Sequence, residues 1–197
     1  MRFFDDWLER VRQISLWAAW FGGSLITISV FIISLEVILR KVFGRSLGGA
    51  DEISSYALAI GSSWAFAYAL FERSHIRVDV VYSRLSRGAR AGLDLLSLLI
   101  LGVVILLLTR YAYDVFATSY IRGATANTPL GTPLWWPQGF WLVGLIWFLF
   151  VDIAIFLRGF FAFVHGDLET IERLAGSHVM EIGEELEGGA NVENGEV

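Results

Sequence analysis

Long runs of apolar residues dominate the pattern of hydrophobic and polar positions along the chain. Four runs are long enough to cross a bilayer, which takes about 20 helical residues. They do not alternate between apolar and polar residues as barrel strands do, and a helix satisfies its own backbone hydrogen bonds in lipid. The pattern therefore predicts an all-α integral membrane protein with four transmembrane helices, at about residues 14–39, 51–71, 92–116 and 138–158.

The two ends of the chain differ from these runs. Residues 3–13 gather their apolar side chains near one helical face, which predicts an amphipathic segment at the membrane interface. These side chains are Phe3, Phe4, Trp7, Leu8 and Val11. Residues 167–197 are acidic and carry no motif. We therefore expect a membrane domain over residues 1–166, followed by a flexible cytoplasmic tail.

Arg and Lys are unevenly distributed between the connecting segments. Ten lie before the first run, between the second and third runs or after the fourth, and five lie on the other side. Because cytoplasmic segments carry an excess of Arg and Lys, this distribution predicts that both termini are cytoplasmic.

Composition narrows the chemistry that the chain can carry. It has 55% hydrophobic and 18% charged residues and no Cys, so a thiolate site is excluded. Its one lysine, Lys41, is not part of a phosphate-binding loop. The three histidines, which would be needed for haem or zinc, lie outside the predicted helices: His75, His165 and His178. We therefore expect no enzymatic activity, cofactor, metal or nucleic-acid partner.

Four charged residues lie close together at the junction of the first and second predicted helices. Glu36 and Arg40 are four residues apart and share a helical face. Asp51 and Glu52 begin the second helix, where the helix dipole favours acids. One interpretation is a structural charge cluster that fixes this helical hairpin. The other is that Arg40 and Glu52 each reach water independently.

Two acids, Asp94 and Asp152, fall within the third and fourth predicted helices. Charges inside a membrane are costly, so such residues are either paired or functional. They could pair with Arg87, Arg90 or Arg158 as structural groups, or they could form a proton or ion relay.

The second predicted helix carries small residues at every fourth position on two faces. One row is Ala57, Gly61, Ala65 and Ala69, and the other is Ser55, Ala59, Ser63 and Ala67. The first helix adds two pairs, Ala18–Gly22 and Ala19–Gly23. Such rows let helix backbones approach closely, so they predict that the second helix lies between two neighbours. The row that contains Gly61 is a candidate partner interface, with packing inside the chain alone as the alternative.

Two connecting segments have distinctive compositions. The basic segment after the second helix contains His75, Arg77 and Asp79 and predicts an interfacial loop on anionic lipid, with His75 as a pH switch as the alternative. Residues 119–137 contain all three prolines and predict a rigid external loop that rests on the membrane or meets a partner.

Several sequence features resemble the small membrane subunit of tripartite ATP-independent periplasmic (TRAP) transporters, the DctQ-like family. They are "EVILRKVFGRSL", "ADEISSYALAIGSSWAFAYAL", "HIRVD" and "TPLGTPLW". The positions that carry the resemblance are Arg40, Glu52, Gly61, His75 and Asp79. Lys41 departs from the family pattern, in which a bulkier residue is expected after the Arg.

The resemblance implies a scaffold subunit in the inner membrane of a bacterium or archaeon. Its partners would be a large permease subunit, a periplasmic substrate-binding protein and membrane lipids. The large subunit would hold the substrate and sodium sites, while this chain would brace it and help dock the binding protein during uptake of an organic acid.

Two alternatives belong to other functional classes. One is a self-sufficient small channel or carrier that uses Glu36, Asp94 and Asp152. The other is a membrane anchor for an enzyme or redox complex, although the predicted helices lack the His ligands of such anchors.

Overall fold

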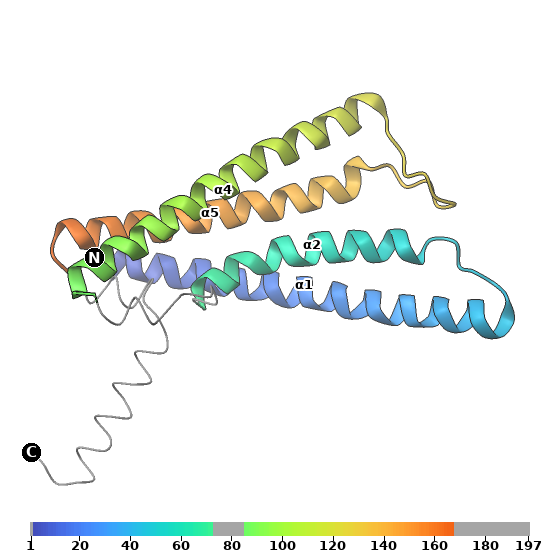
Figure 1. The fold of residues 1–197 in the computed structure, drawn as a ribbon, viewed down its shortest axis with the longest axis horizontal. Helices are drawn as coiled ribbons and strands as arrows, with labels where there is room; N and C mark the ends of the chain where they lie inside the picture. Colours follow the sequence, from blue (N-terminus) through green and yellow to red (C-terminus); the bar gives the residue numbers. More distant parts are fainter. Residues whose placement is uncertain (1, 73–84, 168–197) are drawn as a thin grey trace, which may run out of the picture.

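The computed structural model describes residues 2–72 and 85–167, with side chains described from Trp7 onward. A helix forms over each of the four predicted runs, and no strand forms within the described ranges, which confirms the all-α class. The helices, labelled as in Figure 1, are α1 (Arg2–Phe43), α2 (Ala50–Phe71), α4 (Arg87–Arg122) and α5 (Trp135–Val164). The acidic tail after Asp167 and residues 73–84 lie outside the described residues.

The four helices are arranged as two antiparallel hairpins (Figure 1). α1 packs against α2, α4 packs against α5, and α2 joins the hairpins by contacting α5. The hairpins lie closest near the N-terminus and diverge toward the α1–α2 turn and the α4–α5 loop. We call this second end, which carries residues 44–49 and 123–134, the loop end of the bundle.

Three of the described helices are long and apolar enough to cross a membrane: Trp7–Phe43, Arg87–Arg122 and Trp135–Val164. α2 is not among them, because its serines, glycine and tyrosines lower its hydropathy. With 22 residues α2 is long enough to cross a bilayer, and it packs along α1. Because its hydropathy is low, its membrane crossing stays a prediction. The orientation of the termini likewise stays a prediction.

The N-terminal segment is continuous with the first predicted transmembrane helix, and its location at the membrane interface stays a prediction. It forms the first turns of α1, because no Gly or Pro precedes Gly22 to interrupt the helix. Leu8 and Val11 are buried in the main core with Phe148 and Val151 of α5. The apolar face of this segment, as far as its side chains are described, is therefore covered by another helix.

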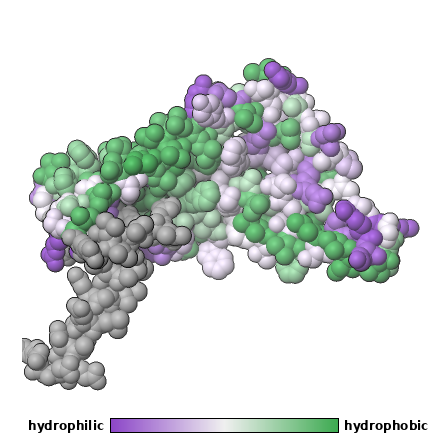
Figure 2. Space-filling model, viewed as in Figure 1, coloured by the Kyte–Doolittle hydropathy of each residue, from purple (hydrophilic) through white to green (hydrophobic). Residues whose placement is uncertain are grey.

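The main core lies toward the N-terminal end of the bundle, where all four helices meet. Its buried members are Leu8, Val11, Ala67, Leu70, Leu98, Ile105, Phe148, Val151, Ala154 and Ile155. Figure 2 shows hydrophobic residues spread over the visible face of α4 and α5, whereas hydrophilic residues gather at the loop end. Many large apolar side chains remain exposed, including Phe31 on α1 and Val104 on α4. Such a surface suits lipid or a membrane-embedded partner.

Candidate functional site: helix contacts and the loop end

Glu36 ties the end of α1 to the turn that follows it. Its side chain is only 4% exposed. The carboxylate accepts hydrogen bonds from Arg40 Nη2 at 2.6 Å, from the Ser46 hydroxyl at 2.7 Å and from the Leu47 amide at 2.6 Å. Hydrogen bonds to a charged group are among the strong ones in proteins, so this carboxylate fixes the course of the turn.

Glu52, at the start of α2, holds the other loop at this end. It is buried and accepts hydrogen bonds from the Tyr56 hydroxyl, at 2.9 Å, and from the Thr128 hydroxyl in the α4–α5 loop. Thr132 of the same loop also interacts with this carboxylate. Glu52 therefore joins the two hairpins where they diverge.

The α4–α5 loop has an ordered shape that brings Thr128 to Glu52. The Gly131 amide donates to the Thr128 carbonyl at 3.1 Å, and Gly131 has a φ of 59°. Pro129 follows Thr128, a position in a β-turn where Pro is favoured. Pro129 and Leu130 lie beside the α1–α2 turn: a Cβ at Gly48 would lie 3.5 Å from Pro129 Cβ, and a Cβ at Gly49 would overlap Leu130. The turn that contains Pro129 therefore places this loop against the opposite hairpin.

The structure distributes the four residues of the predicted charge cluster between separate sites. Glu36 and Arg40 form an ion pair, as their spacing predicts. Asp51 is exposed, and within the described ranges no ion pair joins Arg40 to Asp51 or to Glu52. Glu52 instead binds hydroxyl groups, chiefly that of Thr128, which is 76 residues away in sequence.

The small residues of α2 let it approach both neighbours. A Cβ at Gly61 would lie 2.7 Å from the Gly22 carbonyl oxygen and 2.9 Å from Ile26 Cγ1 on α1. On the other face of α2, Ser63 is buried against Gly144 of α5, where a Cβ would overlap its hydroxyl. As the two rows predict, α2 lies between two helices.

The row that contains Gly61 is the candidate partner interface. At Gly61 this row packs against α1 of the same chain. Ala57 of the same row is buried, whereas Ala65 and Ala69 are half-buried.

Three long-range polar contacts were not predicted from the sequence. The Trp147 indole donates to the Ser15 hydroxyl at 3.1 Å, which links α5 to α1. The Trp64 indole donates to the Phe140 carbonyl at 2.9 Å, which links α2 to α5. Arg12, in the N-terminal part of α1, forms an ion pair at 3.0 Å with Glu72, which directly follows α2. No local spacing in the sequence signals these pairs.

The acids predicted inside the membrane are buried. Asp152 is 1% exposed. Its Oδ2 lies close to Gly102 of α4, and a Cβ at Gly102 would be only 2.5 Å from this oxygen. Its Oδ1 has no hydrogen-bond partner in the part of the chain that the structure describes. Asp94 and Arg158 are also buried, at 1% and 6% exposure. The described residues contain no group of three His, Asp or Glu that could hold a metal ion.

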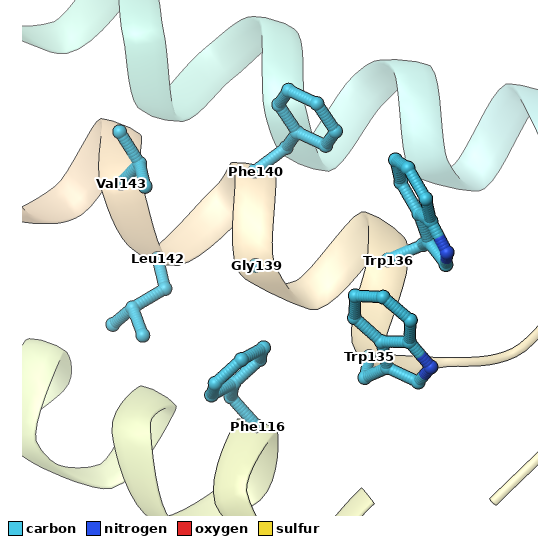
Figure 3. Close-up of a pocket in the computed structure, with 7 residues that line it drawn as sticks. All are labelled: Phe116, Trp135, Trp136, Gly139, Phe140, Leu142 and Val143. Carbon is cyan, nitrogen blue, oxygen red and sulfur yellow. The ribbon is translucent and has the colours of Figure 1, made fainter. Parts of the chain in front are cut away.

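An apolar pocket of about 400 Å³ opens between α4 and α5 at the loop end (Figure 3). Phe116 of α4 faces Leu142 of α5 across it, and Trp135 and Trp136 close one side. The lining side chains offer contact surface and no acid, base or nucleophile. The predicted interfacial loop residues His75, Arg77 and Asp79 lie outside the described residues.

These observations define the class of protein: an integral membrane helix bundle whose described polar groups mainly tie its own helices together. A family model, "Tripartite ATP-independent periplasmic transporters, DctQ component", matches residues 29–162. The chain belongs to this family and is a small membrane component of a TRAP transporter. Neither curated proteins nor solved structures give a match. The matched region includes Glu36, Glu52 and the α4–α5 loop.

Proposed function

We propose that this chain braces the large permease subunit of a TRAP transporter and helps dock its periplasmic binding protein. In this proposal the chain crosses the inner membrane several times, with both termini in the cytoplasm. The large subunit holds the sodium and substrate sites, and the substrate is an organic acid.

The main support for the bracing role is that the buried carboxylates at the loop end bind groups of the chain itself. Glu36 and Glu52 are each engaged by groups of the chain itself, so they stabilise helix ends and are not open to a substrate. The outward faces of α1 and α4 meanwhile carry exposed large apolar residues such as Phe31 and Val104. A rigid bundle with uncovered apolar faces suits packing against a larger membrane protein.

The loop end supports the docking role. With cytoplasmic termini, the α1–α2 turn and the α4–α5 loop face the periplasm together. Both loops are held in one arrangement by Glu52 and by the contact of Pro129 and Leu130 with the turn. Lys41, Arg45 and Arg122 are exposed near these loops and offer positive charge to a binding protein.

The alternative of a self-sufficient channel or carrier has less support. It needs Glu36, Asp94 and Asp152 to act along one route, but Glu36 lies near the end of α1 at the loop end, whereas Asp94 lies near the start of α4 at the opposite end of the bundle. Glu36 is also fully engaged in the α1–α2 turn.

The bracing role is tested by leaving one component out of proteoliposomes that contain the permease, this chain and the binding protein. We expect sodium-driven uptake of an organic acid only with all three present. Uptake that continues at the full rate without this chain would contradict the proposal. As a second readout, the tagged permease should co-purify this chain in the absence of the binding protein.

A further inference from the structure

A second apolar groove, of about 360 Å³, is lined by residues of α1 and α5 and by one residue of α2. α1 contributes Ile14, Trp17 and Phe21, α2 contributes Trp64, and α5 contributes Val143 and Trp147. Trp17 is 74% exposed and forms one wall, so the groove opens toward the surroundings of the bundle.

The polar atoms of the two inner tryptophans are already satisfied. The Trp147 indole donates to Ser15 at 3.1 Å, and the Trp64 indole donates to the Phe140 carbonyl at 2.9 Å. Trp64 is further held by an edge-on contact with Phe21, with ring centroids 5.8 Å apart. Both rings are therefore fixed, and they present carbon surface to the groove. The occupant that suits this surface is an apolar chain.

A cation lies on α1 about one helical turn before the groove begins. Arg10 is exposed and precedes Ile14 by four residues, so it continues the helical face formed by Ile14, Trp17 and Phe21. Within the part of the chain that the structure describes, no ion pair engages this guanidinium. A guanidinium binds phosphate through paired hydrogen bonds.

The distance from the cation to the far end of the groove fits one leaflet of a bilayer. From Arg10 to Phe21 the helix rises about 16 Å, at 1.5 Å per residue. Half of a hydrocarbon core of about 30 Å is nearly the same length. A phosphate at Arg10 would thus place an acyl chain along the whole groove.

We infer that this groove binds a phospholipid, with its phosphate at Arg10 and one acyl chain between α1 and α5. A whole helix of the permease, with a diameter of about 10 Å, does not fit within a volume of about 360 Å³. This site does not depend on the proposed transport function, because it needs only this chain and a bilayer.

The test is native mass spectrometry of the purified full-length chain titrated with phosphatidylglycerol. Arg10→Gln should weaken binding about tenfold, the size of one lost charge-assisted contact. Val143→Trp should fill the groove and abolish the tight site. The matched controls are Arg45→Gln, which removes an exposed cation at the loop end, and Val103→Trp, which enlarges an exposed residue of α4. Both controls should bind like the wild type.

Equal binding by the wild type, Arg10→Gln and Val143→Trp would overturn the site. Loss in Val143→Trp without loss in Arg10→Gln would overturn the phosphate assignment. If Val143→Trp left lipid binding intact but prevented co-purification with the permease, the groove would be a protein contact and the inference would fail. The melting temperature of each variant in detergent shows whether it is folded.

Discussion

The middle of the α1–α2 hairpin and its loop end are stabilised by different kinds of contact. In the middle, the backbones of α1 and α2 meet at Gly22 and Gly61, with no room for a side chain. At the loop end, Glu36 and Glu52 bind hydroxyl and amide groups from the turn and from the α4–α5 loop. Inside lipid, helices associate through close packing, because apolar side chains gain nothing by leaving lipid for protein. At the end of the bundle, where backbone groups of turns need partners, buried carboxylates supply them.

The largest expected effect comes from filling the close contact in the middle. Gly22→Leu and Gly61→Leu should each lower the melting temperature in detergent by about 10 °C or prevent assembly, since the new side chain meets backbone. Gly23→Leu is the matched control, because a Cβ at Gly23 meets nothing within 4 Å. Equal melting temperatures for Gly22→Leu and Gly23→Leu would show that the helices do not approach at Gly22.

The next effect is at Glu36. Glu36→Ala leaves the Ser46 hydroxyl and the Leu47 amide without their acceptor, so we expect the melting temperature to fall by about 5 °C. Arg40→Ala should cost only about 2 °C, because the Arg40 side chain is 62% exposed and Glu36 keeps its other partners. A larger loss in Arg40→Ala than in Glu36→Ala would mean that the ion pair itself stabilises the turn.

A smaller effect is expected at Glu52, which joins the hairpins at one point. Glu52→Ala should increase amide hydrogen exchange in residues 123–134 about tenfold, since Thr128 loses its partner. Asp51→Ala removes the neighbouring acid, which is exposed, and should leave exchange in the loop unchanged. Equal exchange in the two variants would contradict the attachment of this loop to α2.

The smallest effect is expected at Asp152. Asp152→Asn keeps the shape of the side chain and removes a buried carboxyl group whose Oδ1 has no hydrogen-bond partner in the described structure. The melting temperature should therefore stay within about 2 °C of the wild-type value or rise. A fall of more than that would reveal a partner that needs the carboxylate.

The sequence predicts contacts within one helix, and which helix faces pack closely, better than it predicts which distant residues pair. The spacing of Glu36 and Arg40 indicates their ion pair, and the small residues of α2 indicate close helix packing. By contrast, the pairing of Glu52 with Thr128 depends on how the α4–α5 loop folds back, which no local pattern reveals. The same holds for the choice of Gly22 over Gly23, because both lie in the same small-residue pattern.

The first turns of α1 illustrate a different limit of sequence analysis. Their amphipathic pattern fits a membrane interface and also fits packing against another helix. Leu8 and Val11 take the second arrangement, because α5 presents Phe148 and Val151 to them. A hydrophobic face shows that a surface is to be covered, but it does not identify what covers it.

The central claim is that this chain supports a transporter without moving solute itself. The most direct measurement is uptake of radiolabelled organic acids into proteoliposomes that contain this chain alone, under an inward sodium gradient. We predict uptake equal to that of protein-free vesicles. Sodium-dependent uptake by the chain alone, reduced by Asp152→Asn, would contradict the claim and favour a self-sufficient carrier.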